Sequence, residues 1–179
     1  MILVVSCCRH RFSEEEFVKP ITSIMEKLGI SYEIRRYYEK LRFSGYSGVI
    51  ICGTALMDSD YLNYVDNFRI LTGYDGKVLG ICAGYRILAK LYGGMLENIR
   101  RIGVYPVRTV RENPLVHSDS FQAYFLHIYA LRKLNRYMEL IALQDDEACI
   151  FKVVGREFYG VSFHPEVLNE EIIVNFLQL

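Results

Sequence analysis

The stretch KVLGICAGYRILAKL, residues 77–91, decides the fold, because a single cysteine joins an apolar β-type run to an amphipathic helical run. Gly80 and Gly84 lie two residues to either side of Cys82. So sharp a turn strains the backbone at its tip. It presents the Cys82 side chain at the carboxyl end of the strand, as the G-x-S-x-G turn presents its serine. We therefore predict a strand over 77–81, a helix over 84–92 and a thiol held out into a cleft between them.

The position of Cys82 also favours ionisation of its thiol. The partial positive charge at the amino end of the following helix stabilises a thiolate. The backbone N–H of Ala83 would point toward an oxyanion formed on a bound substrate. Most free cysteines are inert packing residues, however, and the two glycines serve equally well to bring helix and strand close together. The turn alone leaves both interpretations open.

Outward from this turn, the first half of the chain alternates between strand and helix patterns. Pro20 lies inside the first helical pattern and either kinks that helix or marks its true start, while Gly29 suits its carboxyl end. This order of elements predicts a parallel sheet covered by helices. Strands are expected at 2–5, 31–37, 48–52 and 77–81, and helices at 13–28, 58–72 and 84–92.

The second half of the chain has a different character. Its β-type segments have little helical periodicity between them, so we expect antiparallel strands added to the edge of the sheet or folded over it. They lie at 101–110, 122–131, 137–143, 148–154 and 157–163, and an amphipathic helix over 169–179 closes the chain. No linker or repeat divides the sequence. We predict one domain, 1–179, of the three-layer α/β class with a mostly parallel sheet and antiparallel additions.

Composition narrows the classes of function. Lys and Arg number 21 and Asp and Glu number 21, so bulk charge gives no reason to expect nucleic acid or a membrane surface as a partner. The first residues lack the pattern of a signal peptide, and no stretch has the length of a membrane span. The five cysteines include no CxxC pair and no zinc-like spacing with histidine. These features favour a cytoplasmic protein without a metal.

A nucleophilic cysteine needs a base, and His164 in the segment FHPEV is the best candidate. Pro165 favours extended backbone at His164, which places Glu166 on the same side as the imidazole. A carboxylate there would fix the tautomer of His164. Taken alone, HPE is equally typical of a polar turn, but together with Cys82 it predicts a Cys-His-Glu triad. His127, inside AYFLHIY, either contacts substrate or fills the core.

Together, GICAG at 80–84 and FHPEV at 163–167 resemble the class I glutamine amidotransferases, whose motifs are G-x-C-x-G-x-Q and F-H-P-E. GVIICGT at 48–54 lies where that family has its oxyanion strand, and AYFLHIY at 123–129 is similar to a substrate-binding segment. The resemblance implies a flavodoxin-like fold. Within the family the chain is most similar to the amidotransferase subunit of GMP synthase, and less so to that of imidazole glycerol phosphate synthase.

The resemblance also implies a role for each matching position. Cys82 would attack the side-chain amide of glutamine, His164 would pass a proton to the leaving ammonia, and Glu166 would orient His164. The N–H groups of Gly53 and Ala83 would hold the oxyanion, and no cofactor is implied. The substrate-binding positions would be Thr54, Arg86, His127, Ile128 and Tyr129. Because the chain ends thirteen residues after Glu166, we expect the synthase that uses the ammonia to be a separate chain.

Three positions depart from the family pattern. Arg86 stands where the family has glutamine, Thr54 follows Gly53 where a second glycine is common, and Ile128 replaces Ser or Gln. These changes affect the expected substrate more than the nucleophile. Two alternatives therefore stay open. One is a hydrolase of a different γ-glutamyl compound, with Arg86 binding an extra carboxylate. The other is a regulatory or binding subunit that keeps the fold but has lost turnover.

Overall fold

A nine-stranded sheet with helices on both faces forms the fold. The computed structural model describes all 179 residues and orders the strands β2-β1-β3-β4-β9-β8-β7-β5-β6. The part β2-β1-β3-β4-β9 is parallel throughout, which is the strand order of flavodoxin-like sheets. This confirms the predicted fold class. The strands are β1 (Ile2–Ser6), β2 (Tyr32–Arg36), β3 (Gly48–Ile51), β4 (Lys77–Ile81), β5 (Glu97–Thr109), β6 (Ser120–Ala130), β7 (Met138–Gln144), β8 (Glu147–Val153) and β9 (Phe158–Val161).

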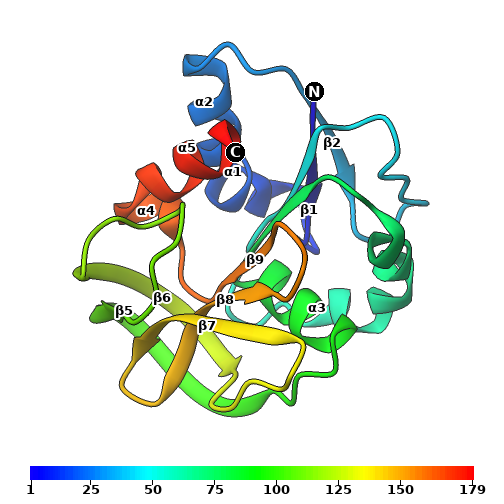
Figure 1. Ribbon diagram of the computed structural model, residues 1–179. Helices are drawn as coiled ribbons and strands as arrows, with labels where there is room; N and C mark the ends of the chain where they lie inside the picture. The colour runs from blue at the N-terminus through cyan, green and yellow to red at the C-terminus, as the bar shows by residue number, and fades with distance from the viewer.

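Two apolar cores lie on the two faces of the parallel strands. One face is covered by α2 (Lys19–Lys27) and α5 (Glu170–Gln178), and the other by the 3-10 helix η2 (Asp60–Gly73) and α3 (Ala83–Leu91) (Figure 1). Successive residues of β1 alternate between the cores. Strands buried on both faces are near-continuous apolar runs, which explains the composition of β1 and β3. The remaining short helices are η1 (Arg11–Ser13), α1 (Glu14–Phe17) and α4 (Pro165–Leu168).

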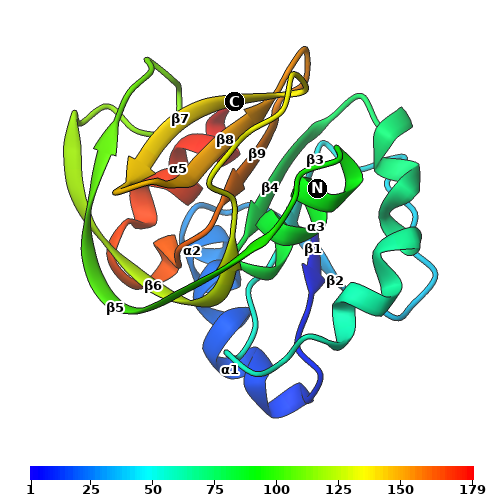
Figure 2. The same ribbon diagram turned by 90° about the horizontal axis from the view of Figure 1, so that it is seen from below.

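The antiparallel strands β8-β7-β5-β6 continue the sheet and curl back over one end of it (Figure 2). β5 and β6 form a long ribbon with one irregularity in register near Asn98. The ribbon returns to the parallel part, because the His164 N–H donates to the carbonyl of Tyr124 in β6 at 2.8 Å. The whole sheet is therefore a half-barrel, and β6 reaches the carboxyl ends of the parallel strands.

One segment of the second half has a different role from the predicted one. Residues 157–163 are not an antiparallel addition at the edge, because β9 lies inside the sheet, parallel to β4 and antiparallel to β8. Phe158, Tyr159 and Val161 have no exposed surface. The apolar, β-type composition identifies a strand, but only tertiary pairing decides its direction. This insertion brings the residues that follow β9 next to Cys82.

The position of Pro20 correctly indicates where the main part of the first helix begins. The helix expected over 13–28 is divided, and Pro20 lies in the first turn of α2. An N–H group there has no partner within the helix, so proline loses no hydrogen bond. Gly29 has a φ of +67° and follows the end of α2, as predicted. The pattern over 58–72 forms a 3-10 helix with a kink at Tyr64 in place of a regular α-helix.

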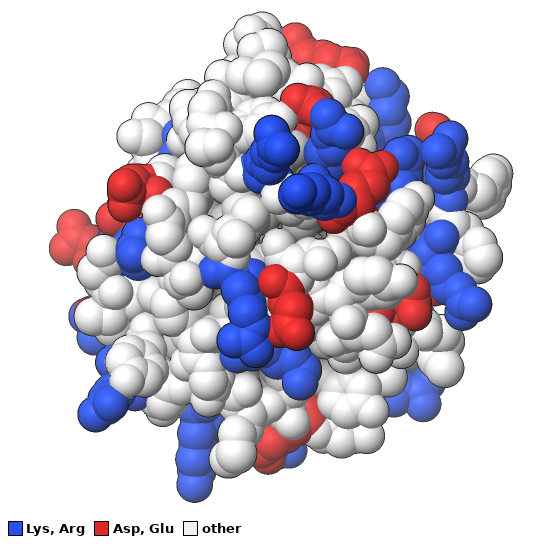
Figure 3. Space-filling view, turned by 90° about the vertical axis from the view of Figure 1, so that its right-hand side faces the viewer, with Lys and Arg blue, Asp and Glu red and all other residues white.

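Charged side chains of both signs are interspersed on the face shown in Figure 3. Several of them form ion pairs at the surface, such as Arg69 with Asp66 and Arg35 with Glu33. No single-sign patch dominates this face, which agrees with the zero formal net charge. None of the helices combines the length and the apolar character that crossing a bilayer requires.

Candidate active site

Three neighbouring parallel strands bring the candidate residues together. Gly53 follows β3, Cys82 follows β4 and His164 follows β9, and β3-β4-β9 are adjacent in the sheet. The carboxyl ends of adjacent parallel strands meet at one edge, which is where open α/β sheets place their sites. Cys82 has φ 48° and ψ −90°, so the tip of the turn is strained as the sequence predicts.

The two glycines around Cys82 serve close packing. A Cβ on Gly80 would lie 2.6 Å from the backbone of Gly84, and a Cβ on Gly84 would collide with the carbonyl of Ile51. Helix α3 therefore approaches β3 and β4 more closely than larger residues would allow. The glycines allow helix and strand to pack closely, as one interpretation predicted. This close packing also permits the strained backbone that holds Cys82 at the tip of the turn.

His164 is held by a carboxylate and covered by aromatic rings. Its Nδ1 lies 2.8 Å from Oε1 of Glu166, which belongs to the first turn of α4. The ring of Phe17 lies 5.4 Å from the imidazole, centroid to centroid, and the ring of Tyr124 lies 6.4 Å from it. The other ring nitrogen, Nε2, is buried and has no hydrogen-bond partner. His164 therefore has one nitrogen held and one free.

Gly53 lies against both His164 and Cys82. A Cβ at Gly53 would lie 2.5 Å from Cε1 of His164 and 3.3 Å from the Cβ of Cys82, so only glycine fits here. The Gly53 carbonyl faces the thiol of Cys8 at 3.9 Å, while its N–H makes no hydrogen bond within the protein. Ala83 begins α3, and the first N–H groups of a helix lack intrahelical partners. Both backbone donors proposed for the oxyanion belong to this edge.

Arg86, one helical turn after Cys82, reaches back to the sulfur. Its Nη2 donates to the Sγ of Cys82 at 3.1 Å, and its guanidinium carbon lies 5.7 Å from the centre of the Tyr61 ring. The sulfur also lies 3.6 Å from the carbonyl oxygen of Leu126 in β6. Arg86 therefore stands beside the candidate nucleophile.

The surroundings of Cys82 favour the thiolate. Burial raises the pKa of a thiol, but the charges of Arg86 and His164 outweigh it and lower the pKa of Cys82 to about 6. For His164, burial disfavours the charged form, but Cys82 and Glu166 raise its pKa well above the usual range. At neutral pH the site thus holds a thiolate beside an imidazolium and a guanidinium. Cys8 differs, since burial raises its pKa to about 11.

The other predicted substrate-binding residues lie near this edge in different settings. The hydroxyl of Thr54 donates to Oδ2 of Asp58 at 2.9 Å and is buried. His127 is also buried, with Nδ1 3.2 Å from the Ser162 carbonyl oxygen. Ile128 and Tyr129 continue β6 as half-buried residues. Of the predicted set, the structure brings Cys82, His164, Glu166, Gly53 and Arg86 into one cluster.

The expected cleft is closed. Cys82 and His164 are each 1% exposed and Arg86 is 2% exposed. The sequence offers no sign of this closure, or of the contacts that Tyr61, Phe17 and the Leu126 carbonyl make, because these groups come from distant segments. Access to the thiol therefore requires movement of the elements that cover it.

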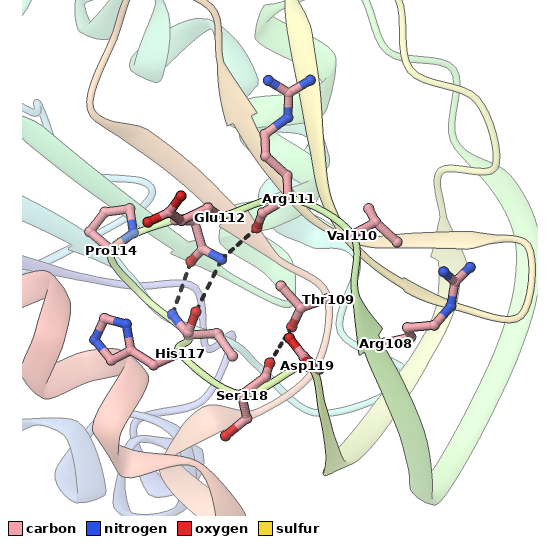
Figure 4. Close-up of a pocket in the computed structure, with 11 residues that line it drawn as sticks. Arg108, Thr109, Val110, Arg111, Glu112, Pro114, His117, Ser118 and Asp119 are labelled. Atoms are coloured by element: carbon pink, nitrogen blue, oxygen red, sulfur yellow. Dashed lines mark hydrogen bonds between the residues drawn. The ribbon is translucent and has the colours of Figure 1, made fainter.

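The largest hollow of the surface lies elsewhere, in the loop between β5 and β6. It has a volume of about 990 Å³ and is lined by residues 108–114 and 116–119 (Figure 4). Its shape is maintained by the loop itself, since the Asn113 side chain bonds four backbone groups and the Thr109 hydroxyl donates to the Ser118 carbonyl at 2.7 Å. Arg108 and Arg111 extend away from the ring of the loop. None of the clustered residues borders this hollow.

The chain belongs to the class I glutamine amidotransferase family. The family model described as glutamine amidotransferase class-I matches residues 13–177, which is nearly the whole chain. This confirms the membership indicated by GICAG and FHPEV, and it identifies the chain as a glutamine amidotransferase at the level of the family.

Known relatives include GMP synthases. The chain is 24% identical over 173 residues to the GMP synthase (glutamine-hydrolyzing) of Petrotoga mobilis, which covers 91% of this chain and 34% of that protein. It is 29% identical over 113 residues to a protein of Methanococcus vannielii that is named as one subunit of a GMP synthase, covering 57% of this chain and 59% of that protein. The chain thus spans about a third of the length of the longer GMP synthases that it matches.

Solved structures agree on the fold. A candidate subunit of GMP synthase from Thermoplasma acidophilum superposes with a TM-score of 0.86 at 19% identity, covering 99% of this chain and 92% of that one. A glutamine amidotransferase from Thermotoga maritima gives a TM-score of 0.71 at 22% identity, covering 92% and 76% of the two chains. At these identities the likeness establishes the shared fold.

Proposed function

We propose that this protein is a glutaminase that hydrolyses the side-chain amide of glutamine and supplies ammonia to a synthase. Cys82 is the nucleophile, His164 the proton carrier and Glu166 the residue that orients His164. One observation carries the proposal: three adjacent parallel strands deliver Gly53, Cys82 and His164 to one edge, with Nδ1 of His164 2.8 Å from Glu166.

In the first half of the reaction the Cys82 thiolate attacks the amide carbon. A C–S bond forms, and the amide oxygen becomes an oxyanion that the N–H groups of Gly53 and Ala83 bind. The His164 imidazolium then gives the proton on Nε2 to the amide nitrogen. The C–N bond breaks, ammonia leaves, and a γ-glutamyl thioester remains on Cys82.

In the second half, water replaces ammonia. Neutral His164 accepts a proton from water through Nε2 while the oxygen attacks the thioester carbon. The C–S bond breaks, glutamate leaves, and the thiolate–imidazolium pair is restored. Glu166 keeps the proton on Nδ1, so that Nε2 is the atom that gives and takes protons. These steps require no metal and no organic cofactor.

We propose further that the ammonia acceptor is a GMP synthase on another chain. Two relatives are named as single subunits of a GMP synthase, which supports a synthase on a separate chain. Apolar side chains at the candidate edge support docking there, since Phe12 is 88% exposed after β1 and Met57 is 80% exposed after β3. Because the site is closed in the free chain, we expect slow hydrolysis of glutamine until the synthase chain is added.

A diazoketone analogue of glutamine tests the proposal. We expect a mass adduct on Cys82, prevented by excess glutamine and absent from Cys82→Ser. Cys149→Ala is the matched control, because Cys149 is a buried thiol of β8 whose pKa burial raises, so its loss should leave the adduct unchanged. If Cys82 stays unlabelled with the synthase chain present, the protein has a binding or regulatory role and is not a glutaminase.

Hydrolysis of another γ-glutamyl compound is the second candidate. Arg86 supports this candidate as well, because a buried guanidinium beside the nucleophile can bind a carboxylate of a γ-glutamyl donor other than glutamine. The same labelling experiment separates the two functions. Protection by γ-glutamyl dipeptides at concentrations where glutamine has no effect would select the second.

A further inference from the structure

Arg86 is a buried cation that has no carboxylate partner. Arg36 pairs with Glu14 and Arg101 pairs with Glu147, but Arg86, at 2% exposure, donates only to the Cys82 sulfur at 3.1 Å. The ring of Tyr61 lies beside it, and the buried hydroxyl of Tyr61 has no hydrogen-bond partner. A buried charge is costly unless an opposite charge balances it. The Cys82 thiolate is the anion that balances Arg86.

Acylation removes that anion. When the thiolate attacks an amide and His164 protonates the leaving ammonia, the thiolate becomes a neutral thioester and the imidazolium becomes neutral imidazole. Glu166 then still lies against the ring of His164, but Arg86 faces an uncharged sulfur in a desolvated site. The family motif has uncharged glutamine at this position, so the problem is particular to a chain with arginine here.

We propose that Arg86 is a specificity-determining residue that exchanges anions during turnover: it pairs with the Cys82 thiolate in the free enzyme and with a carboxylate of the substrate in the acyl-enzyme. This rests on the proposed function and names its substrate class, an amide donor that carries a free carboxylate. In a γ-glutamyl group three carbons separate the acyl carbon from the α-carboxylate, and the flexible side chain of Arg86 spans such a range. Donors with an esterified or amidated α-carboxylate are rejected.

The pairing of Arg86 with the Cys82 thiolate in the free enzyme is tested by measuring the thiolate absorbance near 240 nm as a function of pH. Burial raises the pKa of Cys7, Cys52 and Cys149, and of Cys8 to about 11, so subtraction of Cys82→Ser isolates Cys82. The charged or titratable groups facing its sulfur are Arg86, His164, His127 and Cys7, with Tyr61 facing Arg86. We expect Arg86→Gln to raise the midpoint by at least about one pH unit, and Arg86→Lys to raise it less.

The pairing of Arg86 with a carboxylate after Cys82 is modified is tested with two small alkylating agents. Iodoacetate and iodoacetamide both convert the thiolate to a thioether and release iodide, but only iodoacetate leaves a carboxylate beside the sulfur. We expect the iodoacetate-to-iodoacetamide rate ratio at Cys82 to exceed that of glutathione by at least about tenfold. Arg86→Gln should return the ratio to the glutathione value, and Arg86→Lys should retain part of the preference.

These measurements use neither glutamine nor turnover, so they can fail independently of the glutaminase proposal. Equal ratios for the unchanged protein and Arg86→Gln would overturn the exchange even if glutamine is hydrolysed. Failure of both reagents to reach Cys82 with the synthase chain present would also overturn it, because the open site must admit an anion. Conversely, a strong preference for iodoacetate in a protein without glutaminase activity supports the anion site and refutes only the reaction.

Discussion

Two buried histidine–glutamate pairs lie near Cys82, and they differ in which ring nitrogen faces the carboxylate. At the edge of the parallel strands, Nδ1 of His164 lies 2.8 Å from Oε1 of Glu166, while Nε2 and the second carboxylate oxygen have no partner. In the antiparallel part, His127 has Nδ1 3.2 Å from the Ser162 carbonyl oxygen and Nε2 3.3 Å from Oε2 of Glu147. Nε2 makes no hydrogen bond in either imidazole, but Nε2 of His127 lies beside the Glu147 carboxylate, whereas the Glu166 carboxylate faces Nδ1 of His164 and leaves its Nε2 without an acid.

The carboxylates also differ, since one oxygen of Glu166 has no partner. Glu147 is fully buried, accepts from the Ser162 hydroxyl at 2.6 Å and from Nε of Arg101 at 3.2 Å, and also faces His127. Its three partners join β5, β6 and the segment after β9, so this cluster ties the curled ribbon to the parallel strands. Residue type alone therefore does not identify a catalytic pair. The candidate pair is distinguished by its closer approach to the Cys82 sulfur, since His164 affects that thiol more strongly than His127 does.

The largest effect is expected from removing one imidazole and not the other. His164→Ala should lower glutamine hydrolysis by at least about 10³-fold, because the leaving ammonia loses its proton donor. His127→Ala should lower the rate of the folded protein by less than about tenfold. Hydrolysis is measured with the synthase chain present, and circular dichroism checks that each variant is folded. Equal losses in the two variants would mean that both pairs handle protons and that the distinction fails.

Stability should rank the two glutamates in the opposite order. Glu147→Gln leaves Arg101 without its buried charge partner and should lower the free energy of unfolding by about 3 kcal/mol. Glu166→Gln disturbs one contact and should lower it by about 1 kcal/mol, although its rate of hydrolysis falls further. Urea denaturation monitored by tyrosine fluorescence gives both values. A larger loss of stability in Glu166→Gln would contradict the structural role of the Glu147 cluster.

The sequence predicts the local parts of this site well. The strand–cysteine–helix turn and the pair His164–Glu166 depend on residues within a few positions of one another, and both appear as expected. The parallel order of the first strands follows from the alternation of strand and helix. The family membership follows from the two short motifs.

The parts that sequence could not predict depend on long-range packing. β9 has the composition of any buried strand, and its position beside β4 decides that His164 meets Cys82 at all. The buried partner of His127, Glu147, lies on a different strand, so no local pattern marks that cluster. Whether Arg86 points to solvent, to a carboxylate or to the sulfur depends on its rotamer and on Tyr61, which belongs to a separate helix.

A smaller effect is expected at Gly53, which touches one imidazole and not the other. In Gly53→Ala the new methyl group would lie 2.5 Å from Cε1 of His164, so the ring must turn away from Glu166 or Cys82. We expect kcat/KM for glutamine to fall by about 10²-fold and Tm to fall as well, because the added methyl group overpacks a buried site. Gly73→Ala is the matched control, because a Cβ at Gly73 meets no atom within 4 Å. An unchanged rate in Gly53→Ala would show that the His164 ring does not need its present position.

The smallest expected effect concerns the pH at which Cys82 becomes reactive. Because the pKa of Cys82 is lowered to about 6, its alkylation by iodoacetamide should be nearly constant from neutral to alkaline pH and should decline as pH falls through that value. A nearby cation stabilises the thiolate, so removing one shifts the midpoint upward. His164 lowers the pKa of Cys82 more than His127 does. His164→Ala should therefore raise the midpoint by about one pH unit, and His127→Ala by only a few tenths. If His127→Ala gives the larger shift, the imidazole beside Glu147 carries the charge that activates the thiol, and the roles assigned to the two histidines are reversed.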